Sequence, residues 1–395
     1  MKLQPLFVAA SALSIIAISH ASAINSSEPE FEWSDSVIET EEEGKAILII
    51  PMEGQMHTDV NNSVYSDLVD RIKEAKPDLI VIEILNHDYQ NEFAQLMGWG
   101  DREEFNGYDK DDLVNIARTF HVDLKDIPQV AWVKNASGTS TVLALSWCNI
   151  YMSPDGWLHA TMQVARMFNY INAEDTRGKI REAAVAHAKA FATFGCKDQA
   201  LVRAFVDPEV PLSGTWEGKK VNWEDTLNGD FIVDVGQGMP HLDATTATEL
   251  AISNGIVYNL KDLLVAEGIR EYHIVGEDIT EEINQHKENW RSDFERASEL
   301  FLDAEQYGGW ATGENTARYL REQVKKYKQV LRLMENSSAV AMRMGWKYRV
   351  NTRSLEQMIE QIEEELKRLR EGDSGRRPSG GGGGRPIGGG GGGGR

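Results

Sequence analysis

The chain has 395 residues, of which 41% are hydrophobic, a proportion typical of globular proteins. Its 62 acidic and 41 basic side chains give a formal net charge of −21 at pH 7. Such a charge repels nucleic-acid phosphates and anionic membrane surfaces, so neither is an expected partner. Only two cysteines occur, which excludes a disulfide-dense scaffold.

The N-terminal segment has the pattern of a signal peptide over residues 1–23. It carries Lys2, an apolar run from Leu6 to Ile18, and Ala21-Ser22-Ala23, the type of site that a signal peptidase cleaves. We expect an exported protein, periplasmic or extracellular, with no stable membrane span after cleavage, because no other stretch is long and apolar enough. An uncleaved N-terminal anchor is the alternative.

Residues 24–43 are acidic and lack periodicity, which predicts a disordered leader before a folded part that starts near Gly44. Strands are predicted over 46–51 and 79–85. A helix is predicted between them, because four apolar residues recur at a spacing of four: Val60, Val64, Leu68 and Ile72. Strand, helix and strand in this order require parallel pairing, so the fold class is α/β.

The central stretch, residues 128–154, reads PQVAWVKNASGTSTVLALSWCNIYMSP. It predicts a strand (Gln129 to Val133), a tight turn (Asn135 to Gly138), a buried helix (Val142 to Trp147) and a second strand (Asn149 to Met152). A serine hydroxyl would then lie at the mouth of a helix, where free backbone N–H groups favour developing negative charge. The stretch is a candidate nucleophile region.

The run VAWV…ASG…LALSWCNIYMSP resembles the nucleophile region of the Clp-protease/crotonase superfamily, in particular its NfeD-type and signal-peptide-peptidase-like serine proteases. Residues 46–56 (AILIIPMEGQM), 77–85 (PDLIVIEIL) and 247–269 (ATELAISNGIVYNLKDLLVAEGI) are similar to other segments of that family, in the same order. The resemblance covers about residues 44 to 270. It implies a ClpP/crotonase-like core of repeated ββα units over 44–275 and peptide-bond hydrolysis by a serine.

The family's nucleophilic serine can be aligned with this chain in more than one way. Aligning Ala136-Ser137-Gly138 with the family motif selects Ser137 but needs one extra residue before the next strand. Without that gap the serine position falls on Gly138, and Ser140 is the fallback. The alternative is that Ser137 and Ser140 only cap the helix.

The resemblance implies a lysine base that forms a Ser–Lys dyad. Residues 177–205 resemble the helix that carries this lysine, and both Lys179 and Lys189 fit. Lys189 is preferred because alanines and Phe191 surround it, although either lysine could be an ordinary surface residue. A Clp-like triad with His159 as base competes, and so does a structural role for that histidine.

This chain departs from the family pattern in the loop after the second strand of the family. Its active members carry a Pro-Gly-Gly type loop there, whereas this chain has Asn86 to Asn91 and no glycine before Gly98. Residues 91–108 look like an insertion, either a substrate lid or a loop packed on the surface. The histidines show no metal-ligand spacing and no phosphate-binding loop occurs, so no metal or cofactor is expected.

The remaining segments predict accessory elements. A helix is expected over 109–120 and a projecting hairpin over 207–245. Cys148 is interpreted as a buried free thiol, with a Cys148–Cys196 disulfide as the alternative.

The last part of the chain predicts a helical extension over 276–371. Three apolar stripes there indicate a helical hairpin or three-helix unit with coiled-coil-like character. This unit could assemble the protein into a homo-oligomer, although pairing of the helices within one chain is favoured. Residues 372–395 form a flexible Gly/Arg-rich tail.

Two hypotheses about function remain. The first is an exported serine protease of the Clp, NfeD and signal-peptide-peptidase-like class, acting on peptide or protein substrates. The second is a catalytically inactive member that keeps the core as a binding or assembly module. A crotonase reaction on acyl-CoA is a weaker third, because export removes the protein from the CoA pool.

Overall fold

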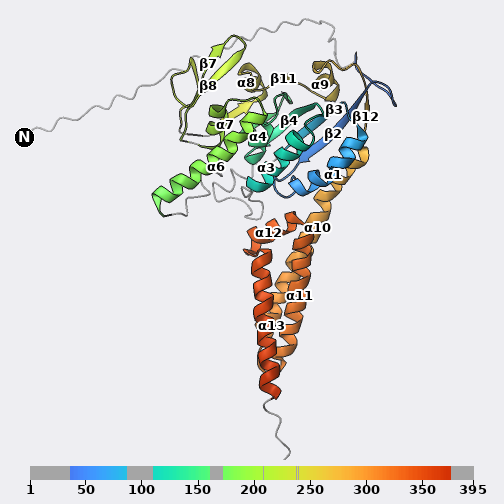
Figure 1. Cartoon of the computed structure of the whole chain (residues 1–395), viewed down its shortest axis with the longest axis vertical. Coiled ribbons are helices and arrows are strands. Elements are labelled where there is room, and N and C mark those ends of the chain that lie inside the picture. Colours follow the sequence, from blue (N-terminus) through green and yellow to red (C-terminus); the bar gives the residue numbers. More distant parts are fainter. Residues whose placement is uncertain are drawn as a thin grey trace, which may run out of the picture.

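A computed structural model describes residues 36–86, 110–160, 172–207, 209–236, 238 and 240–374. It has two parts (Figure 1): an α/β domain, and a long unit of helices that projects from one side of it. This arrangement is the predicted fold class, an α/β core with a C-terminal helical extension. The predicted signal peptide, the loop over 91–108 and the end of the tail lie outside the described residues.

The main sheet is parallel along its central path. Its strands are β1 (Ile38–Glu39), β2 (Lys45–Glu53), β3 (Leu79–Leu85), β4 (Gln129–Ser137), β5 (Ile150–Met152), β11 (Gly255–Ile256) and β12 (Glu271–Ile274), in the order β1-β12-β2-β3-β4-β5-β11. Two short strands lie off this path: β6 (Trp157–His159) pairs in parallel with β4, and β10 (His241–Asp243) pairs antiparallel with β6.

Helices cover both faces of this sheet. Inward-facing residues alternate along each strand, so that Leu48 and Ile82 belong to one buried cluster while Ile47 and Val81 belong to another. The first cluster packs on α1 (Asn62–Ala75), α3 (Lys110–Arg118), α4 (Thr139–Ala144), α6 (Glu174–Phe194) and α7 (Gln199–Val206), and the second on α9 (Leu260–Ala266). Burial on both faces explains why the central strands read as continuous apolar runs.

The folded part begins earlier than the sequence predicts. The predicted disordered leader over 24–43 therefore extends too far. Val37 is buried, and β1 pairs in parallel with β12. The partner strand lies more than 230 residues further along the chain, so no local pattern could reveal this pairing. The interpretation as a disordered leader is therefore wrong for residues 37–39.

Two accessory features complete the domain. A three-stranded antiparallel sheet is formed by β7 (Leu212–Glu217), β8 (Lys220–Glu224) and β9 (Phe231–Asp234), in the region of the predicted hairpin. The turn after β10 leads into the short helix α8 (Ala244–Glu249).

The helical unit has four helices within the described residues 277–374, not three. These are α10 (Glu277–Trp310), α11 (Thr316–Asn336), α12 (Ser338–Tyr348) and α13 (Thr352–Ser374), and they enclose a hydrophobic core of their own. The apolar spacing in the sequence does not predict the short helix α12, because the charged Arg343 occupies one of its buried positions. Among the described helices, none is long and apolar enough to cross a membrane.

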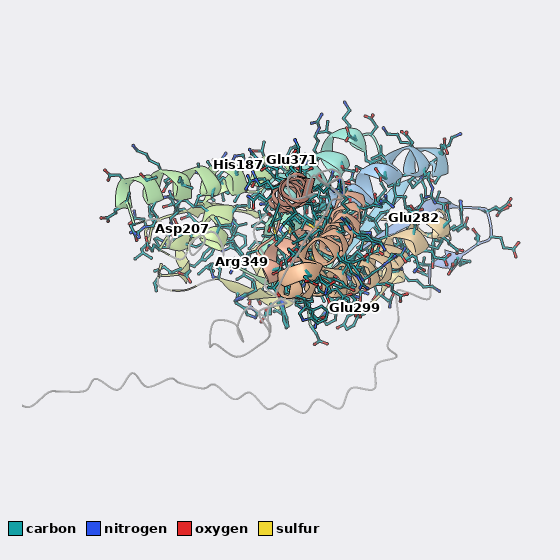
Figure 2. All side chains as sticks on the ribbon, turned by 90° about the horizontal axis from the view of Figure 1, so that it is seen from below. His187, Asp207, Glu282, Glu299, Arg349 and Glu371 are labelled. Atoms are coloured by element: carbon teal, nitrogen blue, oxygen red, sulfur yellow. A yellow bond between two sulfur atoms is a disulfide. The ribbon has the colours of Figure 1, made fainter. Side chains whose placement is uncertain are left out.

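The first turns of α10 belong to the α/β domain. Ile279 and Ile283 are part of its main core, and Arg71 of α1 pairs with both Asp278 and Glu282. Figure 2 views the helical unit end-on, with Glu282 on the part of α10 that joins the domain and Glu371 on α13. The helical unit is thus anchored by its first helix.

Candidate active site

The strand–turn–helix at Ser137 is present, but its strand ends later than predicted and its helix both begins and ends three residues earlier than the predicted Val142 to Trp147. β4 continues through Asn135 and Ala136 to Ser137, and Gly138 alone forms the sharp turn into α4, with φ 65° and ψ −128°. A positive φ of this kind suits glycine, which lacks the Cβ that would clash. Ser137 therefore lies at the end of the strand and not within the turn.

Ser140 acts as a local brace of this turn. Its hydroxyl accepts a hydrogen bond from the backbone N–H of Ser137 at 2.9 Å and lies 2.8 Å from the carbonyl oxygen of the same residue. Both contacts go to the backbone of Ser137, before the helix begins, so Ser140 braces the turn, and among the described residues no side chain caps the N-terminus of α4. Its hydroxyl is engaged, which favours Ser137 over Ser140 as a reactive group.

Three polar side chains around the turn are buried and unsatisfied. Within the described part of the chain, Asn135 Oδ1, Ser137 Oγ and Thr139 Oγ1 have no hydrogen-bond partner. A buried polar group without a partner costs about 1–3 kcal/mol, and most such groups in folded proteins are paired. Three of them within five residues mark this turn as a candidate binding or reaction site.

His159 is the side chain that the fold brings beside Ser137. The parallel pairing of β4 with β6 places Ala136 opposite Leu158 and Ser137 opposite His159. Ala136 and Leu158 both enter the hydrophobic core. Because side chains alternate along a strand, Ser137 and His159 share the other face.

The backbone of His159 is held against the nucleophile turn. Thr141 of α4 places its hydroxyl 2.6 Å from the carbonyl oxygen of His159 and 2.9 Å from that of Ala136. One side chain therefore connects α4, β4 and β6. This contact fixes the position of the histidine relative to Ser137.

The charge state of His159 suits a proton acceptor. Burial, and secondarily the neighbouring His241, lower the pKa of His159 from 6.5 to about 4. Its imidazole is therefore neutral at pH 7, with one ring nitrogen free of a proton. Its Nδ1 lies 3.2 Å from Nδ1 of His241 on β10.

The two predicted lysines lie on α6. The beginning of this helix projects from the body of the domain (Figure 1), and Lys179 is exposed there. Lys189 is half-buried on the part of α6 that packs against the core through Ala188 and Phe191. Among the described residues, no hydrogen bond or ion pair joins either lysine to Ser137. Their role as bases stays a prediction.

Asn86 ties the carboxyl ends of the central strands together. Its backbone N–H donates to the carbonyl of Asn135 at 2.8 Å, and its side-chain amide donates to the carbonyl of Gly54 at 2.7 Å. It directly follows β3, at the start of the segment in which the sequence lacks the glycines of the family pattern. The rest of that segment, residues 87–109, lies outside the described residues.

A buried polar loop adjoins this edge of the sheet. Residues 55–61, after β2, bury four polar side chains: His57, Thr58, Asp59 and Asn61. Asp59 accepts hydrogen bonds at 3.0 Å from Trp290 Nε1 and from Arg291 on α10. The helical unit therefore supports the loop next to the candidate site, a contact that no sequence pattern predicts.

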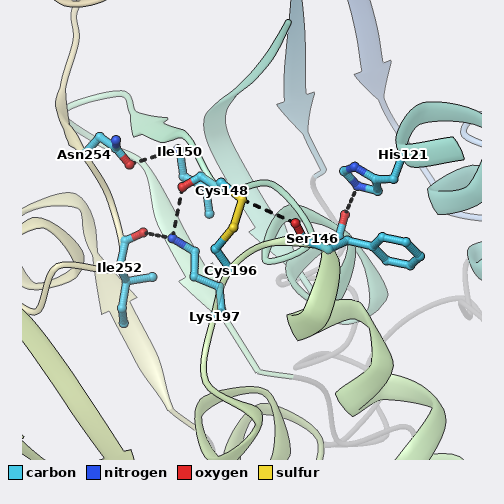
Figure 3. Close-up of a disulfide and its surroundings, with 9 residues drawn as sticks. His121, Ser146, Cys148, Ile150, Cys196, Lys197, Ile252 and Asn254 are labelled. Carbon is cyan, nitrogen blue, oxygen red and sulfur yellow. Dashed lines mark hydrogen bonds between the residues drawn. A yellow bond between two sulfur atoms is a disulfide. The ribbon is translucent and has the colours of Figure 1, made fainter. Parts of the chain in front are cut away.

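A hydrogen-bonded serine–histidine pair lies near the disulfide (Figure 3). His121 Nε2 is 2.8 Å from Ser146 Oγ, and the imidazole stacks on Phe194 with ring centroids 5.0 Å apart. Burial lowers the pKa of His121 to about 4. The contact joins the π-helical turn Thr119–Asp123 to the end of α4, and the sequence analysis did not single it out.

The interpretation of Cys148 as a buried free thiol is wrong. Cys148 is exposed and forms a disulfide with Cys196, with the two Cα atoms 5.2 Å apart. The next residue, Lys197, donates to the carbonyl of Ile252 at 2.8 Å, and burial lowers the pKa of its ammonium group to about 8. The Cys148–Cys196 disulfide ties the end of α6 to the segment before β5.

No group of three or more side chains suited to holding a metal ion occurs among the residues that the structure describes.

Comparison with known proteins gives matches among solved structures only: no family model and no curated protein matches the chain. It is similar to a mutant of the 1510-N membrane-bound stomatin-specific protease, with a TM-score of 0.38 and 14% identity over 57% of this chain and 85% of that one. Another mutant of that protease, in complex with a substrate peptide, gives a TM-score of 0.36 and 13% identity over 56% and 80% of the two chains. A peptidase from Plasmodium falciparum gives 0.32 and 12% over 53% and 95%.

These likenesses accompany the resemblance to the Clp/crotonase superfamily found in the sequence motifs. The parallel sheet, and the turn from β4 into α4, are the features of the chain that carry this α/β class.

Proposed function

We propose that this protein is an exported serine peptidase in which Ser137 is the nucleophile and His159 is the general base. The observation that carries this proposal is the register of β4 and β6, which sets His159 directly opposite Ser137. Ser137 Oγ has no hydrogen-bond partner among the described residues, so the two side chains are not bonded to each other in this structure, and the imidazole of His159 is neutral at pH 7. Lys189 and Lys179 remain the alternative bases.

The reaction follows from these two groups. The Ser137 oxygen attacks the carbonyl carbon of the scissile peptide bond while its proton passes to Nε2 of His159. The imidazolium then gives this proton to the leaving amine as the carbon–nitrogen bond breaks, which leaves an acyl ester on Ser137. Water attacks that ester, its proton passes to His159, and the serine oxygen regains a proton when the acid product leaves.

The substrate class and the location rest on the sequence. The resemblance to NfeD-type and signal-peptide-peptidase-like proteases supports a peptide or protein substrate. The segment Ala21-Ser22-Ala23 supports export.

Cleavage of an unfolded protein substrate tests the proposal. The wild-type chain should cleave reduced, alkylated casein, and Ser137→Ala should abolish cleavage. Ser66→Ala is the matched control, because Ser66 lies exposed on α1. Loss of activity in Ser140→Ala with full activity in Ser137→Ala would move the nucleophile to Ser140.

Gly138 favours a second candidate function, that of an inactive binding or assembly module. In serine hydrolases with a nucleophile elbow, the serine itself occupies the sharp strand-to-helix turn, where its hydroxyl is presented to the substrate. In this chain that position belongs to Gly138, and Ser137 is only 1% exposed. This candidate predicts a folded protein that cleaves nothing and forms no covalent adduct with a serine-directed probe.

A further inference from the structure

A row of three side chains crosses three adjacent strands at the candidate site. β6 lies between β4 and β10, and its His159 is in register with Ser137 on one side and with His241 on the other. Residues in register on neighbouring strands face the same way. The row runs from the buried Ser137 through the half-buried His159 to the exposed His241.

We propose that His241 is the positioning residue that orients His159 for the reaction, so that the site is a Ser137–His159–His241 arrangement. This inference rests on the proposed function. Its geometric basis is the 3.2 Å contact between the Nδ1 atoms of the two histidines. One of these nitrogens must donate and the other accept, because two lone pairs or two N–H groups would repel each other.

Only one of the two possible tautomers supports catalysis. If Nδ1–H of His159 donates to Nδ1 of His241, then Nε2 of His159 is unprotonated and can take the proton of Ser137. In the reverse arrangement Nε2 carries a proton and cannot accept another. Protonation of His241 forces that reverse arrangement, because its Nδ1 then becomes a donor.

Two other described residues lie close to His241, namely Trp157 and Asp243. The backbone hydrogen bond from Thr246, and to a lesser degree the charge of His241, lower the pKa of the Asp243 carboxyl. Trp157 of β6 lies beside His241, with ring centroids 5.9 Å apart. The nearest described carboxylate on the same strand is Asp243, whose Oδ1 accepts the backbone N–H of Thr246 at 2.7 Å and so caps α8. Asp243 lies opposite Trp157 in the strand register, two residues along from the His159–His241 pair.

The test compares three substitutions of His241 in the full chain, with the pH dependence of casein cleavage as the readout. In His241→Ala we expect kcat to fall roughly ten- to a hundred-fold, less than on loss of the base itself, with KM unchanged. In His241→Asn the amide oxygen can accept from Nδ1 of His159, so most of the activity should return. In His241→Asp the carboxylate should raise the pKa of His159 and move the acidic limb of the profile to higher pH.

A second readout is independent of turnover. The pKa of His159, followed by NMR of its imidazole, should rise in His241→Ala because the neighbouring His241 helps to lower it, and should rise further in His241→Asp. His187→Ala is the matched control, since His187 lies on the exposed face of α6 (Figure 2) and should leave both readouts unchanged.

The outcomes separate this inference from the proposed function. Cleavage that depends on Ser137 but keeps its rate and pH profile in all three His241 variants would overturn the role of His241 alone. A wild-type chain that cleaves nothing would overturn both, because His159 would then have no reaction to serve. A fall in kcat without any movement of the acidic limb in His241→Asp would reduce His241 to a structural residue and would also overturn the inference.

Discussion

Ser137 and His159 are Cα partners on two parallel strands, although 21 residues separate them in the sequence. The intervening chain forms the turn at Gly138, helix α4, strand β5 and the return into β6. That path brings a hydroxyl and a neutral imidazole to the same face of the sheet. This relationship is the reason why we propose His159, and not Lys189 or Lys179, as the base.

The first prediction concerns the base. His159→Ala should lower kcat by about 10²- to 10⁴-fold, the usual contribution of a general base, because the proton of Ser137 then lacks an acceptor. Lys189→Met and Lys179→Met should keep at least half of the wild-type rate, measured as casein cleavage at pH 7.5. A loss in Lys189→Met as large as that in Ser137→Ala would instead support the Ser–Lys dyad.

A second prediction concerns the contact between α10 and the loop over 55–61. Asp59→Ala removes the acceptor for Trp290 and Arg291 in a buried site, so we expect the free energy of unfolding to fall by about 2–4 kcal/mol. Urea denaturation measures this change. Asp303→Ala is the control, since its ion pair with Lys326 is exposed and should contribute less than about 1 kcal/mol. Equal effects of the two substitutions would show that the loop contact adds no special stability.

The free energy of unfolding should depend on pH in part because of His121. Burial lowers its pKa from 6.5 to about 4, so between these values the unfolded chain binds more protons than the folded one. Stability therefore rises with pH across this window and is lost as the pH falls through it, by an amount on the order of 2–3 kcal/mol. His159 contributes with the same sign.

Replacing His121 isolates its share of this effect. In His121→Gln the difference between the free energies of unfolding at pH 7 and pH 4.5 should shrink, whereas His187→Gln should leave it unchanged. Urea titrations at the two pH values provide the measurement. An unchanged difference in His121→Gln would mean that the imidazole is not shielded from water in the folded state.

If the protein forms the predicted homo-oligomer, it needs an interface, and exposed apolar side chains on the helical unit are one candidate. Most of its apolar stripes pack within the chain, but Leu302 is 56% exposed and Trp310 is 50% exposed on α10. If self-association uses this surface, Leu302→Glu combined with Trp310→Glu should reduce the solution mass of the full chain to that of a monomer. Light scattering measures the mass. An oligomer that persists in this variant would place the interface elsewhere.

The sequence could predict the central strands and the location of the turn before α4, because both depend on local patterns. The run at 46–51 is continuously apolar, the run at 79–85 is apolar except for Glu83, and they form β2 and β3. The small residues before α4 indicated a turn. The backbone conformation then assigns the turn to Gly138 and places Ser137 on the strand, a distinction of one residue that composition does not resolve.

Several features that the sequence missed depend on distant partners. His241 meets His159 across 82 residues, and no local motif marks it. Asp59 reads as a surface residue of a polar loop, but Trp290 and Arg291 bury it. Val37 and Ile38 are a short apolar pair in an acidic segment, and the burial of Val37 follows from the pairing of β1 with β12.

The reactivity of Ser137 is the central claim, and a covalent probe tests it most directly. The folded wild-type chain is incubated with a fluorophosphonate, and the modified residue is identified by mass spectrometry of its peptides. We predict one adduct, on Ser137, that forms more slowly when His159 is replaced by alanine. An adduct on Ser140, or a folded chain that carries no adduct at any pH, would contradict the assignment, and the second result would favour the inactive binding module.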